Sequence, residues 1–138
     1  MLANVAPFAT LVLLLVWMGF FQLGSLPLMI LKHDTPLDAR FIRGLFDVYY
    51  KAVLTVGVAG ILTHALAHRP WTTVGMVAIC AIAWLSRRLI VSRMDAIRAV
   101  MTPEDAVRIR EFRKLHVMGM VLNFVQLLAI CFTLPKVL

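Results

Sequence analysis

The sequence predicts an all-α fold: a polytopic membrane four-helix bundle with cytoplasmic helical extensions, built as a single integral membrane domain over residues 1–138. Two observations predict it. Hydrophobic residues make up 62% of the 138 residues and charged residues only 15%, with a mean hydropathy of +0.89, whereas soluble domains carry about 25% charged residues. The chain also contains four apolar segments, each close to the roughly 20 residues that a helix needs to cross a bilayer.

The four segments are delimited by charges and prolines. The first contains no charged residue and lacks the basic start and cleavage site of a secretory signal, so it is expected to be retained. The second holds Lys51 near one end, from where a lysine side chain reaches the interface. The third ends where Arg87 and Arg88 begin, and Pro135 follows the fourth. The expected spans are residues 7–31, 48–67, 71–91 and 117–134.

The two long connections contain helix start signals. Thr35–Asp38 and Thr102–Asp105 both read Thr-Pro-x-Asp, in which threonine caps, proline suits the first turn and the acid favours the N-terminus. We therefore expect the second helix to start near Pro36 and the fourth to run over residues 103–134. The third is expected to continue beyond the bilayer to Met101.

Basic residues are distributed unequally between the two sides of the expected bundle. Of the 14 Lys and Arg residues, all but Arg69 and Lys136 lie in or beside the two long connections. The positive-inside rule places these connections in the cytoplasm and both termini in the periplasm of a bacterial inner membrane. Because topology accounts for the net charge of +7, no nucleic-acid partner is expected. The expected partners are the lipid bilayer and other membrane subunits, or copies of this chain.

Polar residues of the fourth span share one helical face. His116, Asn123 and Gln126, with Gly119 between them, recur at steps of three and four residues, which places them in line. Such a face has to meet protein rather than lipid. It is interpreted either as interhelical hydrogen bonding or as a cofactor site for haem or quinone, with Gln22 and Ser25 of the first span as facing residues.

Two histidines near the end of the second span are the candidate metal ligands. His64 and His68 are four residues apart, a spacing that lets two side chains bind one metal ion from one helical face. No third ligand is evident nearby, and the alternative is a pair of interfacial histidines. No pattern of catalytic residues is present, and Cys80 and Cys131 are expected to be unpaired.

These features favour an accessory or structural subunit of a larger inner-membrane assembly, without a catalytic motif. Gly57 with Gly60, or Trp17 with Phe21, would be its contact faces. One alternative is a membrane oxidoreductase that binds haem or quinone through His116. Another is a small-solute carrier, which the absence of acidic residues within the spans disfavours.

Short motifs resemble a known family. They are Phe112–His116 followed by Asn123 and Gln126, Ser92–Met94, and Phe46 with Tyr49 and Tyr50. Together with four spans they resemble the small four-helix membrane proteins related to transmembrane protein 205, which implies an inner-membrane bundle and no particular reaction. A looser resemblance, through Trp17–Gly19, Pro27 and His33, is to the haem-containing membrane protoporphyrinogen oxidase, which implies a four-helix bundle that binds haem.

Overall fold

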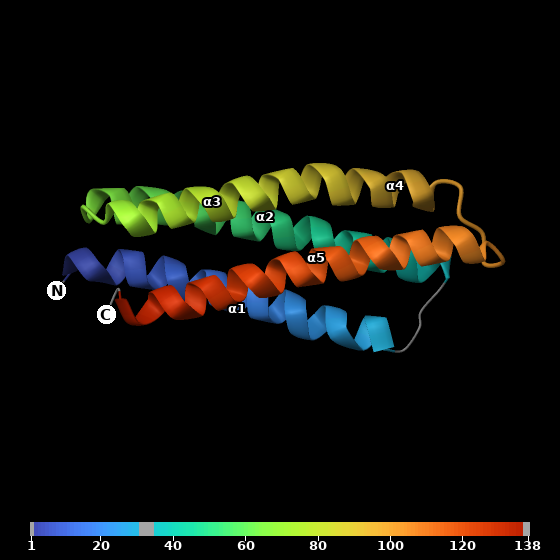
Figure 1. Cartoon of the computed structure of the whole chain (residues 1–138), viewed down its shortest axis with the longest axis horizontal. Helices are drawn as coiled ribbons and strands as arrows, with labels where there is room; N and C mark the ends of the chain where they lie inside the picture. Colours follow the sequence, from blue (N-terminus) through green and yellow to red (C-terminus); the bar gives the residue numbers. More distant parts are fainter. Residues whose placement is uncertain (1, 31–34, 137–138) are drawn as a thin grey trace.

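The computed structural model describes residues 2–30 and 35–136, and all regular structure in these residues is helical. Four helical rods lie side by side in an elongated bundle (Figure 1). The start of α1 and the end of α5 lie at the same end as the α2–α3 turn, and the α4–α5 connection lies at the other. The elements are α1 (Leu2–Ile30), α2 (Pro36–Leu66), α3 (Pro70–Ser86), the π-helical turn η1 (Arg87–Val91), α4 (Ser92–Arg98), α5 (Ala106–Thr133) and the 3₁₀ turn η2 (Leu134–Lys136).

The rods are suited to a membrane by length and composition. Four stretches of the described residues are long and apolar enough to span a bilayer, with mean hydropathies of 1.5 to 2.0. Large apolar side chains such as Phe20, Leu23 and Phe132 lie mostly exposed on the outside of the bundle. An outer surface of this kind is stable against lipid rather than water, so the structure supports the expected multi-pass membrane protein.

The start of α2 confirms the capping signal. Thr35 Oγ1 accepts a hydrogen bond from the backbone N–H of Asp38 at 3.2 Å, and the Asp38 carboxylate accepts one from the backbone N–H of Thr35 at 3.0 Å. This reciprocal pair satisfies two of the backbone donors that a helix N-terminus leaves free. Local sequence alone therefore determines where α2 begins.

The expected start of the fourth helix at Pro103 is wrong. Residues 99–105 form the turn that reverses the chain between α4 and α5, and α5 begins at Ala106. Asp105 provides the cap, because its Oδ1 accepts a hydrogen bond from the backbone N–H of Arg108 at 3.0 Å. That bond holds the pKa of the Asp105 carboxyl below its usual range. Two capping signals lay within four residues, and the turn uses the second.

Two other boundaries also differ from expectation. The first helix begins at Leu2 rather than Pro7, so Pro7 lies inside it, and its carbonyl accepts a bond from Thr10 Oγ1 at 2.8 Å. The third rod does continue past the expected span, but it stops at Arg98 instead of Met101 and contains the π-helical turn η1. A π turn adds a residue to the helical repeat and re-aims the side chains around it.

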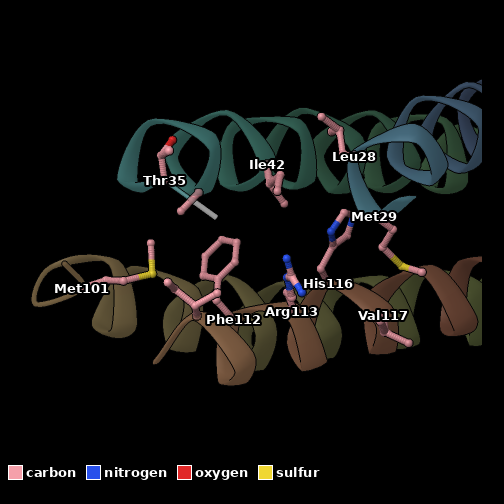
Figure 2. A pocket seen from close by; sticks show the side chains of 11 residues that line it. Leu28, Met29, Thr35, Ile42, Met101, Phe112, Arg113, His116 and Val117 are labelled. Carbon is pink, nitrogen blue, oxygen red and sulfur yellow. The ribbon is translucent and has the colours of Figure 1, made fainter. Parts of the chain in front are cut away.

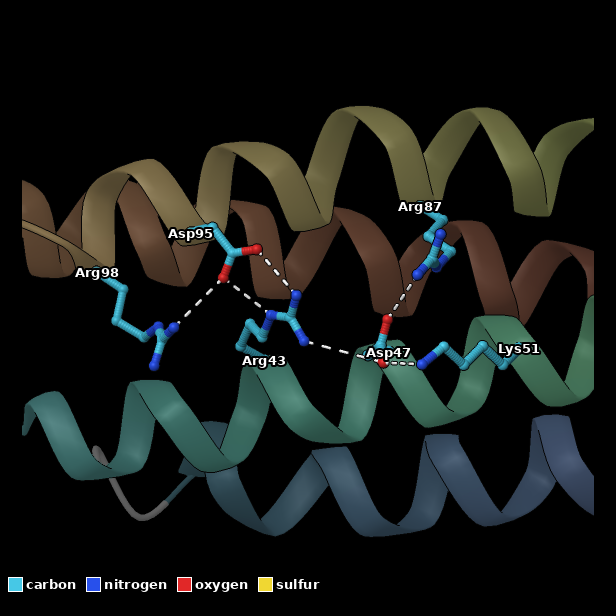
Figure 3. A network of polar contacts seen from close by, with 6 residues as sticks. All are labelled: Arg43, Asp47, Lys51, Arg87, Asp95 and Arg98. Atoms are coloured by element: carbon cyan, nitrogen blue, oxygen red, sulfur yellow. Dashed lines mark hydrogen bonds and ion pairs between the residues drawn. The ribbon is translucent and has the colours of Figure 1, made fainter.

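Ion pairs connect α2 to the far half of the third rod (Figure 3). Arg43 donates two hydrogen bonds of 2.9 Å to the carboxylate of Asp95 on α4. Asp47 accepts from Arg87 of η1 at 2.9 Å and pairs with Lys51 at 2.7 Å. These pairs fix how α4 lies along α2, and so position the end of the bundle where α5 begins.

Small residues let the second and third rods approach closely. A Cβ atom added to Gly57 would overlap the sulfur of Cys80, and one added to Gly60 would lie 3.1 Å from the sulfur of Met76. On the other side of α2 an aromatic cluster fills the core: the Phe21 ring stacks on Tyr49 with centroids 4.1 Å apart and meets Phe46 edge-on at 4.8 Å. Gly57, Gly60 and Phe21 are thus buried inside the bundle and are not the exposed contact faces that were expected.

Candidate functional site

The polar face of α5 lies inside the bundle, as its spacing predicts. Asn123 is 1% exposed, His116 2% and Gln126 5%. Gly119, between them, packs directly against the Phe46 ring of α2, and an added Cβ there would overlap the ring. The absence of a side chain at residue 119 therefore brings α5 close enough to α2 for its polar side chains to reach other helices.

Asn123 is the centre of a hydrogen-bond network that joins three helices. Tyr49 Oη of α2 donates to Asn123 Oδ1 at 2.7 Å. Asn123 Nδ2 donates to the carbonyl oxygen of Met18 at 3.0 Å and to Gln22 Oε1 at 2.9 Å, both on α1. Groups of the chain itself occupy both the oxygen and the nitrogen of the amide, so Asn123 links the three helices by hydrogen bonds. This geometry gives no support to the cofactor role considered for Asn123.

Gln126 is only half satisfied. Its Nε2 donates to the carbonyl oxygen of Leu122 in its own helix at 3.2 Å, while its Oε1 is buried without a partner among the described residues. The side chain lines a groove of about 420 Å³ between α3 and α5. Figure 1 shows the two helices well apart at the end of the bundle that holds the termini. Gln126 thus faces a hollow that the described residues do not fill.

His116 lines a different cavity, at the opposite end of the bundle (Figure 2). The cavity lies between α1, α2 and α5, and its volume is about 150 Å³. The imidazole points from α5 toward α1 and α2, and its Nε2 atom is buried without a hydrogen-bond partner among the described residues. The structure therefore separates His116 from Asn123 and Gln126, so the three do not form one site.

The metal site expected at His64 and His68 does not form on one helical face. Helix α2 ends at Leu66, and His68 lies in the turn beyond it with a φ of 53°, in the left-handed region. His64 is buried, and its Nδ1 lies 2.9 Å from the carbonyl oxygen of Gly60. In the described residues no group of three or more metal-ligating side chains comes together. The four-residue spacing fails because the helix stops between the two histidines.

Sequence reasoning missed two partners that matter here. Tyr49 was named only within the family resemblance, and Asp95 was not singled out, although Tyr49 bonds to Asn123 and Asp95 accepts two hydrogen bonds from Arg43. Tyr49 and Asn123 are 74 residues apart, and Arg43 and Asp95 are 52 apart. No local pattern indicates pairs at such separations. His33 lies outside the described residues.

Comparison with known proteins adds no assignment. No family model matches the chain, and neither a curated protein nor a solved structure matches it. Both family resemblances stay predictions.

Proposed function

We propose that the chain is an accessory or structural subunit of a larger inner-membrane assembly, whose other members are membrane proteins or further copies of this chain. One observation supports the proposal: the groove between α3 and α5. α3 and α5 touch at only a few residues, and they leave about 420 Å³ unfilled between their apolar parts. Inside a bilayer, a groove of this kind is either filled by a lipid chain or covered by a helix that packs against it.

The lining of the groove favours a helix. Gly75 and Ala78 of α3 face Ala129 of α5 across it, with Gln126 on the α5 side. Small residues let another helix approach closely. In a membrane the hydrophobic effect does not drive helices together, so their association depends on close packing of this kind. The groove therefore replaces Gly57, Gly60 and Phe21 as the contact face, because those three residues are occupied within the bundle.

Filling the groove should disrupt association. We expect Gly75→Leu combined with Ala129→Leu to reduce co-purification of a partner helix, or self-association, by about tenfold, since large side chains would occupy the space of the incoming backbone. Chemical crosslinking in native membranes followed by mild detergent extraction measures this. Ala81→Leu, on an exposed part of α3 outside the groove, is the matched control.

Two results would contradict the subunit proposal. One is unchanged crosslinking in the Gly75→Leu, Ala129→Leu chain. The other is recovery of the unaltered chain as a monomer with phospholipid, and no protein, in the groove.

The proposed orientation has both termini in the periplasm and the α4–α5 connection in the cytoplasm. The distribution of basic residues supports it. In a chain with Cys80→Ala and Cys131→Ala, a cysteine at the exposed Ala99 should resist a membrane-impermeant thiol reagent in intact cells. A cysteine at the exposed Leu66, at the other end of the bundle, should react. The reverse pattern would overturn the orientation.

A second candidate function is a membrane oxidoreductase, and the buried, unpartnered His116 favours it. Haem does not fit the cavity beside this residue, because about 150 Å³ has room for one ring and not for the four linked rings of a porphyrin. An absorption spectrum of the purified chain checks this point: a Soret band would restore haem as the ligand.

A further inference from the structure

The cavity beside His116 has the size and walls of a site for a single ring. It lies between the last turns of α1 and the first turns of α2 and α5 (Figure 2), and apolar side chains such as Leu28, Ile42 and Phe112 form most of its wall. An apolar cavity of roughly 150 Å³ holds one six-membered ring. The space inside therefore suits a small, flat headgroup.

The imidazole of His116 provides a polar group inside these apolar walls. The Phe46 ring meets it edge-on, with centroids 5.6 Å apart, so the imidazole is held in place. Its Nε2 has no hydrogen-bond partner in the described part of the chain. Leaving a buried polar atom unpaired costs about 1–3 kcal/mol. A ligand that bonds to Nε2 would supply the contact that the described residues do not provide.

A groove on the outer surface of the bundle lies next to this cavity. It runs between α1 and α5, has a volume of about 300 Å³, and shares Met29 and Val117 with the wall of the cavity. Val121 and Phe124 form its outer part and are about half exposed. Met29 and Val117 border both hollows and are exposed side chains, so a molecule whose ring lies in the cavity can pass over them and place its apolar chain along α1 and α5.

We propose that the cavity and the groove together bind a membrane quinone, with the ring beside His116 and the isoprenoid chain between α1 and α5. A quinone ring is flat and uncharged, and its carbonyl oxygen accepts a hydrogen bond from an imidazole N–H. A fatty acid would fill the groove equally well, but its carboxylate would lie among mostly apolar side chains, which costs free energy unless Arg113 pairs with it. Arg113 also lines the cavity, so the test includes the carboxylate. The inference rests on the second candidate function and concerns binding alone.

The experiment measures binding to the full chain in phosphatidylcholine nanodiscs. Decylubiquinone is titrated, and the rise in the apparent melting temperature, followed by far-UV circular dichroism, gives the apparent Kd. We expect a saturable shift with one ligand per chain. His116→Phe keeps the ring shape but loses the N–H, so it should weaken binding by about tenfold, the value of one buried hydrogen bond.

A surface variant tests the groove without altering the core. Val117→Trp places a bulky side chain where the groove meets the cavity and should abolish the shift, while Leu128→Trp, on the lipid-facing side of the same helix, should leave it unchanged. Full affinity in both His116→Phe and Val117→Trp would overturn the inference. So would an equal shift with dodecanoic acid or dodecane in place of decylubiquinone.

The titration contains no reductant, which separates this inference from the function on which it rests. In a separate assay with an added electron donor, a chain that binds decylubiquinone but does not accelerate its reduction supports the quinone site and contradicts the oxidoreductase. Loss of partner association in the α3–α5 groove variants bears only on the subunit proposal.

Discussion

Replacing Asn123 with alanine is expected to lower the free energy of unfolding of the bundle by about 2–4 kcal/mol. The change leaves Tyr49 Oη, Gln22 Oε1 and the Met18 carbonyl without the amide that each contacts. Interhelical hydrogen bonds in membranes contribute roughly 0.6–2 kcal/mol each, and buried groups left unpaired add to the loss. Reversible unfolding in mixed micelles, with increasing sodium dodecyl sulfate, measures the difference.

Two control variants test whether the stability lost in Asn123→Ala comes from the hydrogen-bond network. Tyr49→Phe removes one of the three bonds and keeps the ring, so it should cost only about 0.5–1.5 kcal/mol. Val125→Ala, on the exposed side of the same helix, should change stability by no more than about 0.5 kcal/mol. If Asn123→Ala costs no more than Val125→Ala, the network does not hold the three helices together.

The second large effect is expected at Gly119. In Gly119→Ala the new Cβ overlaps the Phe46 ring, which is fully buried and flanked by Phe21, Tyr50 and His116. The ring is held between these neighbours, so either α5 shifts away from α2 or the side chains are strained. Overpacking of this kind costs about 1–3 kcal/mol, and a shift of α5 would also lengthen the Tyr49–Asn123 hydrogen bond.

Whether Gly119→Ala lowers or raises the free energy of unfolding distinguishes an effect of packing from an effect of helix propensity. Alanine is favoured over glycine in a helix by about 1 kcal/mol, so Gly24→Ala, where no atom lies within 4 Å of the added Cβ, should stabilise the bundle or leave it unchanged. Adding Phe46→Leu to Gly119→Ala should recover part of the loss through the space it creates. A stabilising Gly119→Ala, measured by the same micelle unfolding, would show that the two helices are not in contact there.

Much of the architecture follows from local chemistry. The four apolar segments predict the four rods, because a segment that crosses hydrocarbon has to hydrogen-bond its backbone polar groups within itself, as a helix does. The Thr35–Asp38 signal predicts the start of α2, since both hydrogen bonds of a capping box lie within four residues. The steps of three and four from His116 to Gln126 predict a buried face on α5, because that spacing is a property of any α-helix.

Local chemistry fails where two signals compete or where a helix ends between two residues. Thr102 and Asp105 are both good caps, and only the path of the α4–α5 turn selects Asp105. His64 and His68 share a helical face only if the helix continues, and α2 stops at Leu66. The start of α5 and the end of α2 depend on tertiary packing, because in each case the chain has to turn back so that the next rod packs against the previous one.

The sequence by itself determined that His116, Asn123 and Gln126 lie on one buried face, and the tertiary structure decided that they do different things. Asn123 meets Tyr49 and Gln22, and Gln126 faces the groove between α3 and α5. His116 lines a separate cavity, where its Nε2 has no hydrogen-bond partner among the described residues. The spacing along one helix sets the direction of a side chain. What that side chain meets depends on the other rods, whose residues lie up to about a hundred positions away and whose distance from α5 is set by contacts such as Gly119 on Phe46.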